Sequence, residues 1–97
     1  MAASPPVSGL PWCARGDYPA LLELFSDPDM LPATYGAWLR RAEATERQLQ
    51  KAGFGVARIW IRPVPFAAWC KKRNVSPDQR ARLTFANEAA RGLSARK

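Results

Sequence analysis

The sequence predicts a small α+β protein that is mostly helical, with the order helix, helix, strand, helix, helix. Apolar residues recur every three or four positions in the predicted helices, and they alternate with other residues over about 54–62. Periods of 3.6 and 2 are typical of helices and strands, respectively. The 97 residues suffice for one domain. We expect a flexible, proline-rich tail over 1–16, a single compact domain over 17–93 and a frayed end over 94–97.

Two helices are predicted to follow the tail. Asp17 can cap a short helix over 18–26, and the Asp27-Pro28 step ends it because proline disfavours helical conformation in the residue before it. The clearest helix spans 33–52. One face of this helix is formed by Trp38, Ala42, Thr45, Leu49 and Ala52.

The predicted strand over 54–62 has no obvious partner. Its two faces consist of Ala57, Ile59 and Ile61 and of Arg58, Trp60 and Arg62. An isolated strand leaves backbone donors and acceptors unpaired, so two arrangements are open. Either a second strand lies within 1–16, or the strand pairs with its copy across a two-fold axis. The prolines of the tail favour the homodimer.

Two further helices are predicted after the strand. Pro65 can open a helix that runs to about Arg73, and Asn74 can take the left-handed conformation that ends it. Residues 76–79, Ser-Pro-Asp-Gln, provide a helix N-cap, a proline at the first helical position and a capping-box glutamine. We expect this last helix to end at Gly92.

The net charge of +7 is spread unevenly along the chain. Residues 1–36 hold one basic and four acidic side chains, a net charge of −3, whereas residues 37–97 hold fourteen and four, a net charge of +10. A cationic half suits an anionic partner, such as nucleic acid or an acidic protein. The alternative is a solvated surface that keeps the protein soluble.

Residue types that carry chemistry are scarce. The chain has no histidine, and its two cysteines, Cys13 and Cys70, are not spaced as metal ligands. Cys70 is the only candidate nucleophile in a predicted element, but it lies on the apolar side of its helix. We therefore predict a protein that is not an enzyme and uses no cofactor or metal. No apolar run is long enough for a membrane helix and the first residues lack the pattern of a secretory signal, so we expect a cytoplasmic protein with free thiols and no membrane partner.

Residues 56–91 have the layout strand, helix, turn, helix, which resembles the ribbon-helix-helix family of DNA-binding proteins. In that family, two chains pair their strands antiparallel and the resulting ribbon lies in the major groove. The resemblance implies nucleic-acid contacts by Arg58, Trp60, Arg62, Lys71, Lys72, Arg73 and Ser76.

The same resemblance implies distinct roles for parts of this segment. Ile59 and Ile61 would face the core, while Ser76 and the backbone amides of Asp78 and Gln79 would meet a phosphate at the helix N-terminus. The tracts 66–70 and 82–88 are also similar to small bacterial proteins without an assigned activity, which implies no function.

Two functional hypotheses therefore remain open. One is a dimeric DNA-binding or regulatory protein that uses a strand ribbon. The other is a small accessory protein that binds an acidic partner protein. In a third interpretation, Arg58 and Arg62 are merely solvated and Trp60 packs on the helix over 33–52.

Overall fold

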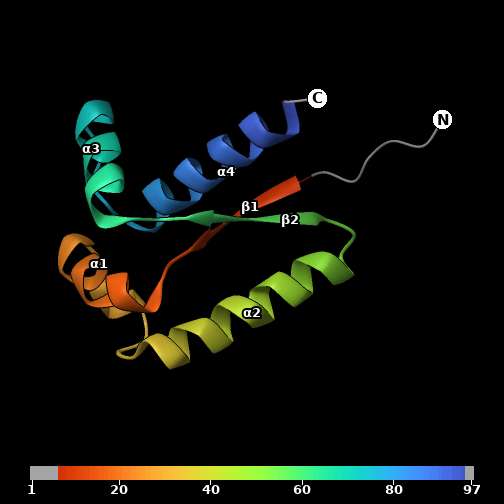
Figure 1. Cartoon of the computed structure of the whole chain (residues 1–97), viewed down its shortest axis with the longest axis horizontal. Coiled ribbons are helices and arrows are strands. Elements are labelled where there is room, and N and C mark those ends of the chain that lie inside the picture. The colour runs from red at the N-terminus through yellow and green to blue at the C-terminus, as the bar shows by residue number, and fades with distance from the viewer. Residues whose placement is uncertain (1–6, 96–97) are drawn as a thin grey trace.

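The computed structural model describes residues 7–95, and in it two parallel strands lie between two layers of helices (Figure 1). In chain order the elements are β1 (Val7–Trp12), α1 (Tyr18–Leu24), α2 (Tyr35–Lys51), β2 (Gly55–Trp60), α3 (Pro63–Arg73) and α4 (Gln79–Ala95), with short 3-10 turns at Arg15–Asp17 and Pro28–Met30. The predicted α+β, mostly helical class is confirmed, and so are all four helices and the strand.

The first strand lies in the segment that was predicted to be a flexible tail, and that prediction is wrong for β1. Strand β1 pairs in parallel with β2, from Val7 opposite Gly55 to Trp12 opposite Trp60. The N–H of Ile61 donates to the carbonyl of Trp12 at 2.7 Å and extends the ladder. The second strand within the same chain, the less favoured of the two predicted arrangements, is therefore the one observed. The first six residues of the predicted tail lie outside the described part of the chain.

Proline is tolerated in β1 because of where it faces. In a parallel pair, alternate residues bond the neighbouring strand. Since Ile61 bonds Trp12, the backbone groups of Gly9 and Pro11 point away from β2. The N–H of Gly9 donates to Oδ1 of Asn87 in α4 at 3.0 Å. Pro11 has no N–H to satisfy on that outer edge, which is the position where strands accept proline.

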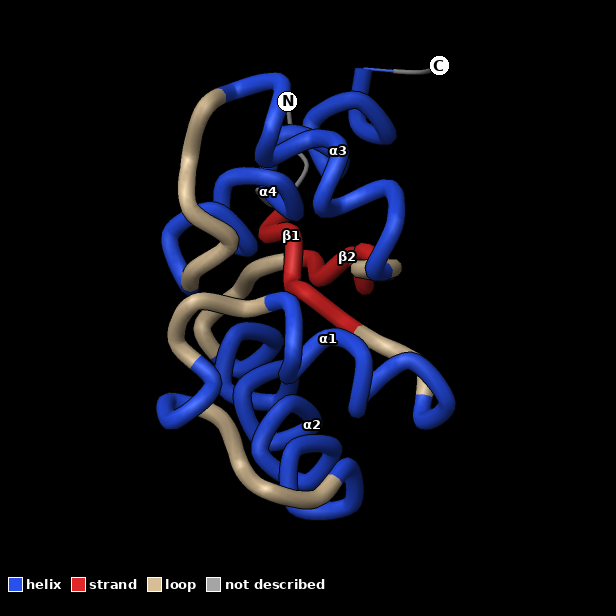
Figure 2. Tube along the Cα trace, turned by 90° about the vertical axis from the view of Figure 1, so that its left-hand side faces the viewer, coloured by secondary structure: helices blue, strands red, loops and turns tan. Residues whose placement is uncertain are grey.

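Helices cover both faces of the sheet. Figures 1 and 2 show α4 on one side of the strands and α2 on the other. On the α4 side, Ile59 packs with Ala86 and Ala90, whose small side chains let the helix approach closely. On the α2 side, Trp12 packs with Ala42. Helices thus lie against both faces of the short sheet, as is typical of parallel strands, although Trp60 on the α2 face of β2 stays exposed.

A second part of the core lies beyond the end of the sheet, among α1, α3 and the start of α4. Aromatic rings dominate it, and the ring of Phe66 meets those of Phe25 and Phe85 edge to face. Edge-to-face contacts are a favourable geometry for aromatic pairs. The buried members of this cluster are Cys13, Tyr18, Leu21, Phe25, Ile61, Phe66, Cys70 and Ala81.

The ends of α4 differ from the prediction. The helix begins at Gln79, and Asp78 rather than Ser76 acts as its cap, because the Asp78 carboxylate accepts the amide N–H of Ala81 at 2.9 Å. Gly92 does not end the helix, which continues to Ala95. The predicted left-handed residue at the end of α3 is confirmed, since Asn74 has a φ angle of 58°.

Candidate nucleic-acid interface

Arg58 lies on the α2 side of β2, where its charge is already compensated. Its Nε and Nη2 atoms each donate to the Glu46 carboxylate at 2.8 Å, and its guanidinium lies 3.9 Å from the centroid of the Trp12 ring. Hydrogen bonds from Arg58 hold the pKa of Glu46 below its usual range. The Arg58 side chain is 44% exposed. The Arg58 guanidinium, which the resemblance predicts to contact a DNA base, is therefore already bonded to a carboxylate and stacked on an aromatic ring.

Trp60 and Arg62, which were predicted to share an interface with Arg58, lie farther along the same chain segment and are more exposed. Trp60 is 53% exposed, so it is not packed under α2. The Arg62 side chain is 72% exposed, and its Nε lies 4.0 Å from the Asp17 carboxylate. At this distance and exposure the pair contributes little to stability.

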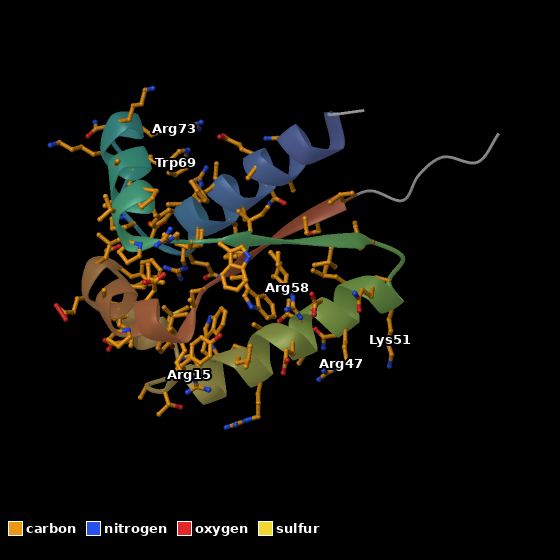
Figure 3. All side chains as sticks on the ribbon, in the orientation of Figure 1. Arg15, Arg47, Lys51, Arg58, Trp69 and Arg73 are labelled. Atoms are coloured by element: carbon orange, nitrogen blue, oxygen red, sulfur yellow. The ribbon has the colours of Figure 1, made fainter. Side chains whose placement is uncertain are left out.

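The cations at the end of α3 lie apart from the strand. Lys71, Lys72 and Arg73 occupy the last turn of α3, while Arg62 precedes its first turn. The eleven residues of α3 span about 16 Å at 1.5 Å per residue. Arg73 stacks over Trp69, 4.6 Å from its ring centroid, and pairs with Glu88 of α4 (Figure 3). The predicted site residues thus form two groups rather than one surface.

The two backbone amides at the start of α4 that were predicted to meet a phosphate are already bonded within the chain. The N–H of Gln79 donates to the Asp27 carboxylate at 3.0 Å, and the N–H of Asp78 donates to the carbonyl of Ser76 at 2.8 Å. The Asp78 carboxylate also accepts the N–H of Ala81, so two carboxylates, those of Asp27 and Asp78, already face this helix N-terminus and would repel a phosphate. Ser76 itself is exposed, and it lines an open groove of about 370 Å³ together with Arg73.

The Asp27 carboxylate at this position also forms the most buried ion pair in the described chain. Arg82 is only 7% exposed, and its Nη1 and Nη2 donate to Asp27 at 2.8 and 3.0 Å. Its guanidinium lies over the ring of Phe25. Hydrogen bonds from Arg82 lower the pKa of Asp27. The pair joins segments 55 positions apart, so its role is structural, and no local sequence pattern indicates it.

Apart from the four arginines in ion pairs, the lysines and arginines of residues 7–95 have no carboxylate within ion-pair distance among the described residues. The sequence did not predict which cations would lack a partner. Three of them, Arg40, Arg47 and Lys51, are exposed and recur after seven and four positions along α2. This spacing places them on the helix face opposite the buried Ala42. The complete set of such cations consists of Arg15, Arg40, Arg41, Arg47, Lys51, Lys71, Lys72, Arg80 and Arg91.

We call Arg40, Arg47 and Lys51 the α2 stripe. Figure 3 shows Arg47 and Lys51 projecting away from the sheet, whereas Arg58 lies between the sheet and α2. The ion pair between Glu43 and Arg47 that helical spacing allows is not formed. The spacing of the three cations along the helix could be seen in the sequence. Which face of α2 would be exposed to solvent, however, depended on the position of the sheet.

Both cysteine thiols are buried and free. Burial raises the pKa of Cys13 to about 12, and it also raises that of Cys70. The sequence placed Cys13 in the flexible tail over 1–16, and this prediction is wrong, because Cys13 is buried in the core. Cys70 packs as a small apolar residue, and its raised pKa disfavours the reactive thiolate. Across residues 7–95, no group of three or more cysteine or acidic side chains is arranged to hold a metal ion.

Comparison of the chain with protein-family models, with curated proteins and with solved structures found no match. In the described part of the chain, none of the helices combines the length and apolar character needed to cross a membrane.

Proposed function

We propose that this protein is a non-enzymatic, cytoplasmic binding protein that contacts the phosphate backbone of nucleic acid through the α2 stripe. The observation that carries the proposal is the set of exposed cations on α2 that have no carboxylate partner, in a protein with a net charge of +7. Phosphates supply most of the affinity of non-specific nucleic-acid binding. Contacts to them need exposed cations rather than a shaped pocket.

The distribution of acidic side chains supports this assignment. Glu46, which lies on the same helix, is turned toward Arg58, so it does not neutralise the stripe. Asp27 and Glu88 are likewise engaged with arginines of their own chain. Internal pairs thus occupy these three carboxylates, and Glu43, the other acidic residue of α2, forms no ion pair with the stripe.

The dimensions of the stripe suit a polyanion. Arg40 and Lys51 are eleven residues apart on one helix, a distance of about 16 Å along its axis. Each strand of duplex DNA carries a phosphate about every 3.4 Å of axis, so the stripe can follow several phosphates. The ribbon surface predicted from Arg58 is less suitable, because its guanidinium would first have to leave Glu46 and Trp12.

We expect duplex DNA binding that weakens steeply as salt rises. The test is fluorescence anisotropy of a labelled duplex between about 50 and 200 mM salt, with wild type and the triple variant Arg40→Gln, Arg47→Gln, Lys51→Gln. Each lost phosphate contact reduces the magnitude of the negative slope of log K against log salt by about one. The slope of the triple variant should therefore be smaller in magnitude than that of wild type by roughly two to three. These three side chains are exposed, so the variant should remain folded.

A matched control removes the same amount of charge elsewhere. The variant Lys71→Gln, Lys72→Gln, Arg91→Gln has the same net charge as the α2 variant, and we expect it to retain most of the salt slope. Equal losses in both variants would mean that net charge, not the α2 stripe, controls binding. Absence of binding at the lowest salt would reject the proposal. Polyglutamate binding with the same salt slope as DNA would favour an acidic protein partner instead.

A further inference from the structure

The two edges of the sheet are built differently, and we propose that the open edge of β2 pairs antiparallel with β2 of a second copy of this chain. The sequence alone suggested a dimer for a strand that lacked any partner. In the structure β2 already has a partner on one side, so the dimer would instead be a four-stranded sheet with the two β2 strands at its centre. This inference does not depend on nucleic-acid binding.

The outer edge of β2 has free backbone groups. Because the N–H of Ile61 donates to β1, the alternation of a parallel strand directs the N–H and C=O groups of Val56, Arg58 and Trp60 away from β1. Within residues 7–95, no other strand pairs with this edge, and among the side chains of residues 7–92 none bonds these backbone groups. An open edge with regular free donors and acceptors is a template for another strand.

The outer edge of β1, in contrast, offers few free donors. Pro11 offers no N–H, and the N–H of Gly9 is already taken by the side chain of Asn87. A head-to-tail contact between β2 of one copy and β1 of the next would therefore find only the N–H of Val7, at the start of the strand, as a donor on β1. A contact of β2 with itself instead has regular donors and acceptors on both strands, and a self-complementary contact closes at two copies around a two-fold axis. This selects a second copy as the occupant of the edge.

The side chains at this edge fit the same arrangement. Antiparallel pairing centred on Arg58 places Trp60 opposite the partner's Val56, a β-branched and aromatic pair of the kind that stabilises sheets. The exposed half of the Trp60 ring would be covered by this contact. The two central Arg58 side chains would not leave unbalanced charges facing each other, because each is paired with Glu46 of its own chain.

The test is the solution mass of the free protein, measured by light scattering over a range of concentrations, for wild type and for Trp60→Pro. The N–H of Trp60 points away from β1, so proline at this position leaves every hydrogen bond within the chain intact. We expect wild type to reach twice the chain mass as concentration rises and Trp60→Pro to stay a folded monomer. Added salt should strengthen the dimer by screening like charges, whereas it should weaken DNA binding.

Two further variants make the result decisive. Ala57→Pro, which removes an N–H directed toward β1, should unfold at lower temperature than Trp60→Pro. If Trp60→Pro does not fold, Trp60→Lys replaces it, and we expect this exposed substitution to give a folded monomer because it removes the apolar contact and adds like charges. A wild type that stays monomeric at all concentrations would overturn the inference, as would a dimer that persists in the folded Trp60→Pro or Trp60→Lys variant.

Discussion

Gly9→Ala is expected to destabilise the fold by roughly 3 kcal/mol, at the upper end of the usual cost of overpacking a core. A Cβ atom at Gly9 would lie 2.1 Å from the carbonyl oxygen of Ala86 and 2.5 Å from its carbon, which are backbone atoms of α4. No side-chain rotation can relieve this contact. The strand and helix would have to separate, and the packing of Ile59 against Ala86 would be lost with them.

The measurement for Gly9→Ala is thermal and urea unfolding followed by circular dichroism. For a domain of this size, 3 kcal/mol corresponds to a fall in Tm on the order of 15 °C. The control is Gly16→Ala, whose added Cβ meets no atom within 4 Å, and we expect its Tm to be unchanged or slightly higher. If Gly9→Ala melts as Gly16→Ala does, the close contact of β1 with α4 is not present.

Asp27→Ala is expected to cost about 3 kcal/mol or more, because it leaves the buried guanidinium of Arg82 without its carboxylate. The substitution also removes the acceptor of the Gln79 amide at the start of α4. A surface ion pair would cost well under 1 kcal/mol. The size of the effect therefore distinguishes a buried pair from an exposed one.

Urea unfolding of Asp27→Ala gives this free energy, and two variants control it. Asp29→Ala removes an exposed carboxylate two positions away, and we expect less than about 0.5 kcal/mol from it. Adding Arg82→Met to Asp27→Ala removes the unpaired charge and should restore part of the lost stability, since apolar replacements of buried pairs are often tolerated. A double variant less stable than Asp27→Ala would show that the guanidinium is not penalised by burial.

The local elements could be predicted from the sequence because their signals are local. The apolar period around Trp38, the alternation around Ile59 and the left-handed Asn74 each require only a few neighbouring residues, and each was confirmed. Strand β1 could not be predicted in this way. Its proline, Pro11, argues against a strand unless one knows that it faces an unpaired edge, and that depends on which side β2 occupies.

The candidate site shows the same limit. Arg58 was predicted to point outward because the strand alternates, and it does lie on the face opposite Ile59. That face, however, is covered by α2, which brings Glu46 to the guanidinium, while the neighbouring strand β1 supplies the Trp12 ring. The charges and their spacing could be predicted from the sequence. Which cations pair with a carboxylate, as Arg58 does, and which remain unpaired, as Arg47 does, depended on how the helices pack on the sheet.

The most direct test of this account is the hydrogen exchange of individual β2 amides, followed by NMR in dilute solution. Pairing with β1 on one edge predicts slow exchange at Ala57, Ile59 and Ile61 and fast exchange at Val56, Arg58 and Trp60. Raising the protein concentration should then slow the second set alone. Fast exchange at Ala57 and Ile59 in the dilute protein would contradict the parallel sheet on which the fold, the α2 stripe and the dimer edge all depend.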